Sequence, residues 1–180
     1  DVARIEAGFV LQGVDYVSAK SCLVDSLKST PDDAGLGWTV DLDRDYFVGQ
    51  RAIRSERKRG PVWDLVGLNI SWEGLEELYS EYEIPPHLAP KACRSAVPVY
   101  NWDGDQVGQV TSTTWSPTVK RYLALAQVRR PHNEIGKDLY VEHTPMFERR
   151  KVQATVVEKP FFDPPRKRDT PASRPQVKEE

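Results

Sequence analysis

The stretch GDQVGQVTSTTWSPT, residues 104–118, carries more information about the fold than any other part of this sequence. A Gly-Asp turn leads into a strand with two apolar valines. A run of hydroxyl side chains at 111–114 follows, and after Trp115 the strand is expected to end at Ser116-Pro117. β-branched threonines favour extended backbone, so the stretch predicts one arm of an antiparallel hairpin. Small polar side chains beside an aromatic ring also suit a pocket edge, and the stretch leaves that second role open.

Further short strands flank this hairpin. Alternating apolar residues predict strands at 64–71, 95–100, 106–113, 122–128, 138–142 and 151–157, with one helix at 73–83. Turn signals at Asp103-Gly104, Pro131 and Gly136 separate the later strands. Short strands at this spacing predict a small antiparallel β-barrel or sandwich over residues 60–162.

Residues 1–59 have a different, helix-rich pattern. Apolar spacing predicts a short helix within 1–13, the run Ser29–Asp33 is a helix-start signal, and residues 47–59 predict a surface helix with a basic end. A strand is expected at 38–40, and Gly60-Pro61 marks a domain boundary. Residues 163–180 are rich in proline and charge, which predicts a mobile tail. The fold class predicted for the whole is α+β.

Composition excludes several classes of protein. The 180 residues carry 25 basic and 27 acidic side chains, and this balance argues against a general nucleic-acid binder. No apolar run approaches the roughly 20 residues that span a bilayer, so neither a nucleic-acid nor a membrane partner is expected. Cys22 and Cys93 lack metal or redox spacing and are expected to be buried thiols in a reducing compartment. The three histidines are scattered, so no metal site is expected.

Several separated segments together resemble the C-terminal half of the glycine-cleavage T-protein family, the tetrahydrofolate-dependent aminomethyltransferases. The segments are DVARIEAG (1–8), GLGW (35–38), FVGQRA (47–52), LVGL (65–68), VPVY (97–100), VGQVTS (107–112), WSPT (115–118) and KPFF (159–162). Each segment is short, but they follow the family's order over residues 1–162. The resemblance implies that residues 1–59 end the folate-binding α+β region and that residues 60–162 form the family's C-terminal β-barrel.

The resemblance also implies a function. Family members form a three-lobed ring around a channel that holds tetrahydrofolate, and they move a one-carbon unit from an aminomethyl or methylated donor to this cofactor. An Asp in the first domain positions the folate, and that domain lies upstream of the matched segments. The sequence starts with Asp1, so we expect a piece of a longer polypeptide whose N-terminal half completes the site. No catalytic residue is assigned here, and a cytoplasmic or mitochondrial-matrix location is expected.

The resemblance points to five candidate folate-binding residues. Arg4 and Glu6 lie in the opening segment, although they could equally form a surface ion pair. Trp38 could pack against the flat pterin or belong to the core. Arg166 and Lys167 follow the closing KPFF segment at an offset where family members place a group near the glutamate tail of folate, and a solvated tail is the alternative.

Departures from the family pattern predict a divergent subgroup. The connection Tyr16–Leu27 is longer and more polar than in simple members, Thr113 replaces a glycine, and Glu73–Leu88 is an added segment. A demethylase acting on a methylated amine or a sulfonium compound therefore stays open beside aminomethyl transfer. The alternative from another class is a non-catalytic, free-standing barrel module for protein interaction or folate binding.

Overall fold

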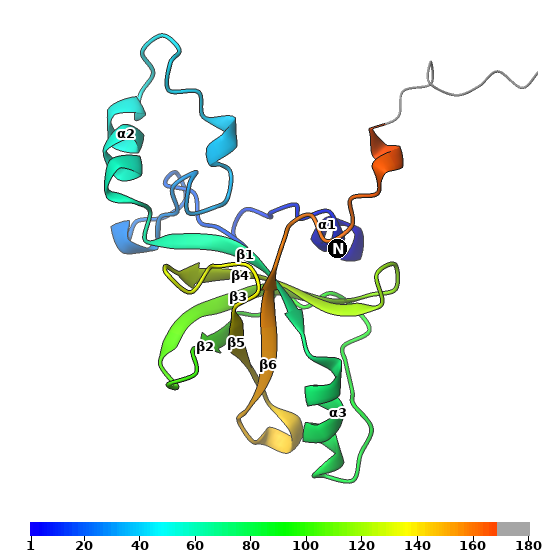
Figure 1. The fold of residues 1–180 in the computed structure, drawn as a ribbon. Helices are drawn as coiled ribbons and strands as arrows, with labels where there is room; N and C mark the ends of the chain where they lie inside the picture. The colour runs from blue at the N-terminus through cyan, green and yellow to red at the C-terminus, as the bar shows by residue number, and fades with distance from the viewer. Residues whose placement is uncertain (169–180) are drawn as a thin grey trace, which may run out of the picture.

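The computed structural model describes residues 1–168, which form a closed β-barrel with short helical segments at its two ends (Figure 1). The strands are β1 (Trp63–Ile70), β2 (Val97–Tyr100), β3 (Gln106–Ser116), β4 (Arg121–Arg129), β5 (Asp138–His143) and β6 (Arg150–Val157). The helices are α1 (Val2–Glu6), α2 (Gln50–Arg59) and α3 (Trp72–Ser80), with 3₁₀ helices η1 (Asp25–Leu27), η2 (Gly37–Thr39), η3 (Pro145–Phe147) and η4 (Pro165–Lys167).

The barrel closes through β1, which pairs with β4 on one side and with β6 on the other. The strand order around the barrel is β1-β4-β3-β2-β5-β6, and every neighbouring pair is antiparallel. The strands predicted from the alternating pattern are therefore confirmed, as are the antiparallel barrel and the α+β class.

Aliphatic side chains fill the barrel, because alternate residues of each strand point inward. Fully buried members of this core include Leu68, Val99, Val110, Val128 and Leu139. A bulge between Val110 and Ser112 shifts the register between β3 and β4. Before this bulge β3 and β4 approach closely, since a Cβ at Gly108 would lie 2.3 Å from the backbone oxygen of Gln127.

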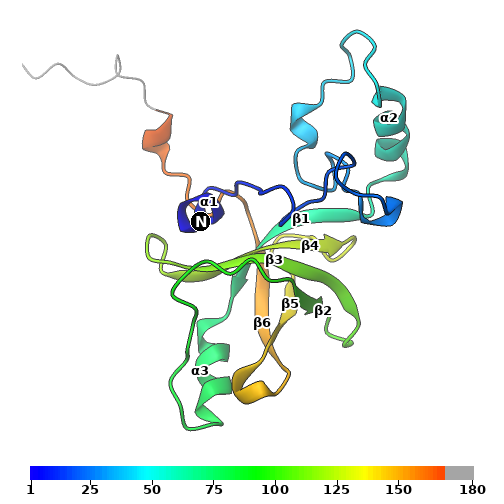
Figure 2. The same ribbon diagram turned by 180° about the vertical axis from the view of Figure 1, so that it is seen from behind.

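Residues 1–62 lie over one end of the barrel, where α1 and the following loops cross β1, β3 and β4 and α2 stands away from the sheet (Figures 1 and 2). The strand expected at 38–40 is wrong, since η2 occupies Gly37–Thr39. The helix-start signal at 29–33 forms only a turn. Thr30 Oγ1 accepts from the Asp33 amide and Asp33 Oδ2 accepts from the Thr30 amide, but no helix follows, and Gly35 has a φ of +67°. The helix predicted at 47–59 is confirmed from Gln50 onward.

The opposite end of the barrel is covered by α3 and by the segment 84–96, which runs back toward α1 (Figures 1 and 2). The helix predicted at 73–83 is confirmed as α3, and Ser71 caps it by accepting from the Gly74 amide at 3.0 Å. The expectation of buried thiols is wrong. Cys22 and Cys93 are free and only half-buried, because Cys22 lies in a loop outside the barrel and Cys93 in a single bridge at its rim.

The remaining expectations concern the tail and other classes of site. The predicted mobile tail falls mostly on residues 169–180, outside the described part of the chain. In residues 1–168, no helix is long and apolar enough to cross a membrane. Over the same residues, no group of three or more His, Cys, Asp or Glu side chains could hold a metal ion.

Candidate functional site

The hydroxyl cluster of β3 surrounds a buried carboxylate, that of Asp15, which is 1% exposed. Thr111 Oγ1 and Ser112 Oγ donate to Asp15 Oδ1 at 2.5 Å and 2.7 Å. The other oxygen, Oδ2, accepts from the Leu11 amide at 2.8 Å. The polar run of the hairpin therefore anchors the N-terminal loop to the barrel.

Arg4 supplies the positive charge that balances this carboxylate. Its Nη1 lies 2.8 Å from Asp15 Oδ2, and its Nη2 donates to Ser112 Oγ at 2.8 Å. Its Nε lies 3.2 Å from Asp1 Oδ1, and Asp1 in turn pairs with Arg94 at 2.6 Å. A buried carboxylate is stable only when it is paired and hydrogen-bonded, and here each oxygen has at least two donors.

Glu6, two residues after Arg4, also holds α1 to the barrel. Glu6 is 8% exposed, and its Oε1 accepts from Ser116 Oγ at 2.5 Å. Its backbone oxygen accepts from the Phe162 amide at 3.0 Å, which holds the segment after β6 beside α1. The alternative of an Arg4–Glu6 surface pair is wrong, because the two side chains bond to different residues of β3. Arg4 and Glu6 both belong to α1, and the structure places their side chains against β3 of the barrel.

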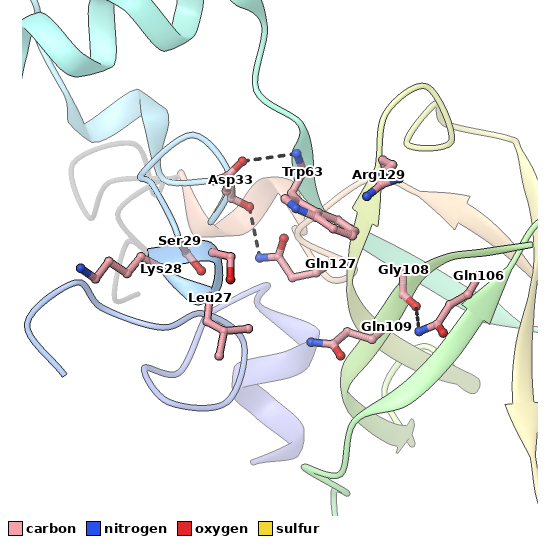
Figure 3. A pocket seen from close by; sticks show the side chains of 11 residues that line it. Leu27, Lys28, Ser29, Asp33, Trp63, Gln106, Gly108, Gln109, Gln127 and Arg129 are labelled. Atoms are coloured by element: carbon pink, nitrogen blue, oxygen red, sulfur yellow. Dashed lines mark hydrogen bonds between the residues drawn. The ribbon is translucent and has the colours of Figure 1, made fainter. Parts of the chain in front are cut away.

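An open pocket of about 370 Å³ lies beside this network, between the loop 26–33 and strands β1, β3 and β4 (Figure 3). Asp33 and Gln127 form its inner wall. Asp33 Oδ1 accepts from the Trp63 amide at 3.3 Å, and Gln127 Nε2 donates to the backbone oxygens of Asp15 and Asp33, each at 3.2 Å. The pocket wall is thus fixed to the buried carboxylate network through one glutamine.

The pocket presents planar polar groups and one indole ring. The Arg129 guanidinium lies 5.2 Å from the centre of the Trp63 ring, and Gln106 and Gln109 of β3 lie along the opposite side (Figure 3). Amide edges and a flat ring suit a planar molecule with several hydrogen-bonding groups. Arg129, Lys28 and Asp33 are the charged residues of the lining, and Lys28 is paired with Asp25 at 2.5 Å.

The other three candidates lie away from this network. Trp38 is 84% exposed on η2, so the expectation that it could be a core residue is wrong. Arg166 and Lys167 form η4, where Lys167 Nζ donates to the Phe162 backbone oxygen at 2.6 Å. In both ribbon views η4 lies on the other side of α1 from η2, so the structure of residues 1–168 does not bring these cations to Trp38 (Figures 1 and 2).

Sequence reasoning missed the residues at the centre of the arrangement, namely Asp15, Asp33 and Gln127. The hydroxyl run at 111–114 was the available signal, because buried hydroxyl groups beside one another need an acceptor. The acceptor itself lies 96 positions from Thr111 in the sequence, and no local pattern marks it.

The match to known families decides the relationship. Residues 65–163 match the family model described as the glycine cleavage T-protein C-terminal barrel domain. This chain belongs to the glycine cleavage T-protein family. The described barrel, β1 to β6, lies within the matched range except for the first residues of β1.

Relatives of the T-protein family match beyond the barrel. An aminomethyltransferase of Parasynechococcus marenigrum is 34% identical over 90% of the chain, and one of Herpetosiphon aurantiacus is 32% identical over 90%. The chain spans only 36% and 37% of these two proteins. The glycine cleavage system aminomethyltransferase T from Bartonella henselae has the same fold over 90% of this chain, with a TM-score of 0.67 and 23% identity. The similarity therefore includes residues 1–62 as well as the T-protein barrel.

Proposed function

We propose that this chain acts as the C-terminal portion of a tetrahydrofolate-dependent enzyme that moves a one-carbon unit from a small donor to the folate. The observation that carries the proposal is the similarity to aminomethyltransferases over 90% of the chain, which includes the helical segments outside the barrel. The donor is an aminomethyl group or a methylated amine or sulfonium compound. Folate, when bound, supplies the ring nitrogen that accepts the carbon unit.

Exposed apolar side chains in residues 1–62 support a role within a larger assembly. Tyr46 and Val48 are 81% and 94% exposed, and Leu23 and Phe9 are exposed as well. Exposed apolar surface is a mark of protein interfaces. We propose that this surface packs against a region corresponding to the part of the relatives that the chain does not span. That region would carry the Asp that positions the folate.

Within that assembly, the residues of this chain would hold the folate and would not react. Arg4 and Glu6 are engaged with β3, so their contribution is to fix the backbone of α1 beside the channel. The exposed Trp38 ring fits a face for the pterin, and the cations Arg166 and Lys167 fit the carboxylates of the glutamate tail. Positioning of folate and donor would supply most of the rate acceleration.

The test uses the native polypeptide that contains this chain. Its intact mass is measured first, and we expect a value well above the 20.5 kDa of these residues. Thermal unfolding is then followed with and without 5-formyltetrahydrofolate, since a ligand that binds the native state raises the melting temperature. One-carbon transfer to tetrahydrofolate is finally assayed with aminomethyl, methylamine and sulfonium donors.

The outcomes separate the two classes of function. A melting shift with turnover of one donor supports the enzyme and identifies its substrate class. A cooperative melt that reduced folates leave unchanged, with no transfer from any donor, contradicts the proposal and favours a non-catalytic interaction module.

A further inference from the structure

A second cavity lies at the end of the barrel opposite residues 1–62. Its volume is about 360 Å³, and it is enclosed by the ends of β1 and β5, the starts of β4 and β6, Thr113 of β3 and the segment 87–98. The walls are mainly apolar, formed by Ile70, Leu88, Val97, Val141 and Val152. The mouth of a β-barrel is a preferred place for a small-molecule site, and this volume is within the usual range for one.

Polar side chains also line the cavity, and one of them is a carboxylate. They are His87, Cys93, Thr113, Tyr122, Glu142, His143 and Thr144. Burial raises the pKa of Tyr122 and lowers the pKa of His143, so neither group carries a charge near pH 7.

The one carboxylate in the lining, that of Glu142, already has partners. Glu142 accepts a hydrogen bond from the Tyr100 hydroxyl at 3.1 Å and lies 3.8 Å from Arg149 Nε. A cationic ligand would therefore have to displace Arg149 from this carboxylate. The lining contains no Lys or Arg for an anionic ligand, and a buried unpaired charge is costly.

A hydrogen-bond chain fixes the tautomer of His143. The Tyr79 hydroxyl donates to the backbone oxygen of His87 at 3.2 Å and lies 2.9 Å from His143 Nε2. A phenol has only one proton, so both contacts are hydrogen bonds only if Nε2 is the protonated nitrogen and donates to Tyr79. The other nitrogen, Nδ1, is then an acceptor, and within residues 1–168 no donor is bonded to it.

We propose that this barrel end is a binding site for a small, uncharged, largely apolar molecule with a single O–H or N–H donor, such as a phenol. The apolar walls bury the body of the ligand, and Nδ1 of His143 accepts its proton. This cavity shares no lining residue with the pocket of Figure 3, so the proposal does not rest on the proposed folate function.

The test uses Cys93 as a reporter in the whole protein. Cys93 lines the cavity, whereas Cys22 lies in the loop before η1 and serves as the internal control. Alkylation of each thiol by iodoacetamide is followed by peptide mass spectrometry in increasing concentrations of phenol, benzene, benzoate or benzylamine. We expect phenol to slow the labelling of Cys93 saturably and to leave Cys22 unchanged.

The probe series tests each part of the proposal. The concentration that halves the rate of Cys93 labelling should be about fivefold lower for phenol than for benzene, which corresponds to one net hydrogen bond. Benzoate and benzylamine should need at least about tenfold more than phenol, because the lining has no Lys or Arg for the carboxylate and because the ammonium must displace Arg149 from Glu142. Equal protection by the charged probes, or no saturable protection by phenol, overturns the proposal.

A matched pair of histidine variants isolates the acceptor. His143→Phe should reduce the advantage of phenol over benzene to less than about twofold, since the acceptor is gone. His132→Phe makes the same change in the β4–β5 turn, at the other end of the barrel, and should keep the advantage. An advantage that survives in His143→Phe contradicts the assigned role of Nδ1. Should His143→Phe fail to fold, the four-probe series on the unaltered protein still decides the question.

Discussion

Thr111 and Asp15 lie 96 positions apart in the sequence, and the Thr111 hydroxyl donates to the Asp15 carboxylate at 2.5 Å. This contact, together with those from Ser112 and Arg4, fixes the N-terminal loop to β3. The loop has no strand pairing with the barrel, so side chains hold it in place. Its position over the barrel therefore depends on one buried negative charge.

Replacement of that charge should be costly. Asp15→Ala leaves Arg4 and two buried hydroxyls without their acceptor, and we expect the free energy of unfolding to fall by about 3–5 kcal/mol. Urea denaturation measures the change. Asp25→Ala is the matched control, because the Asp25 side chain is 92% exposed in its pair with Lys28 and its loss should leave stability unchanged. Equal losses in the two variants would contradict the assigned role of Asp15.

Two glycines in the barrel should respond differently to the same substitution. A Cβ at Gly67 would lie 2.7 Å from Cε1 of the Phe161 ring, whereas one at Gly108 would meet the Gln127 backbone. Each change to Ala should cost about 1–3 kcal/mol of stability through overpacking. In a Phe161→Ala background the cost at Gly67 should fall below about 1 kcal/mol, while that at Gly108 should persist. Thermal or urea unfolding of the three single and two double variants tests this, and a rescued Gly108→Ala would show that the strands can separate there.

The stability of the protein should depend on pH through His143. Burial lowers the pKa of His143 below its ordinary value of 6.5. As pH falls below 6.5, the unfolded chain binds a proton that the folded chain does not yet bind, so the free energy of unfolding decreases until the lowered pKa is reached. One such group contributes a slope of up to about 1.4 kcal/mol per pH unit.

A His143 variant measures this contribution. His143→Phe should reduce the loss of stability that the unaltered protein shows between pH 6.5 and the lower pKa of the folded state. Urea unfolding at a series of pH values gives both slopes. An unchanged slope in His143→Phe would mean that other groups control stability in acid.

The cations of η4 should matter for folates with long glutamate tails. The double variant Arg166→Ala with Lys167→Ala, made in the native polypeptide, should raise the dissociation constant for a triglutamyl tetrahydrofolate by about three- to tenfold, because exposed ion pairs are individually weak. Titration at low and high salt measures the effect, which should shrink as salt rises. Arg121→Ala removes an exposed cation from the start of β4 and should leave binding unchanged. An equal loss for both variants would indicate a general charge effect.

The barrel could be predicted from the sequence because its signals are local. The alternation in 64–71 or 122–128 and the turn at Asp103-Gly104 need no knowledge of distant residues, and β1, β4 and the β2–β3 hairpin form there. The strand expected at 38–40 failed for the opposite reason. A strand needs a partner, and around Trp38 residues 1–62 supply only an isolated bridge between Gln12 and Tyr16.

The candidate site was only partly predictable. The hydroxyl run and the opening segment with Arg4 and Glu6 stood out in the sequence, but their partners did not. Asp15 and Ser116 reach these groups through tertiary contacts across 97 and 110 positions. Charged pairs of this kind depend on the completed fold, so composition and periodicity carry no signal for them.

The closed ring of strands has a consequence for solubility. Each strand of the barrel has two hydrogen-bonded neighbours, so the barrel has no open edge strand that could pair along its whole length with a second molecule. Unpaired strand edges are the usual template for edge-to-edge aggregation. Self-association of this protein at high concentration should therefore arise from exposed apolar side chains. These lie both in residues 1–62 and in the loops of the barrel, where Trp102 and Phe147 are 82% and 97% exposed. Charged substitutions at such loop positions are the means to suppress it.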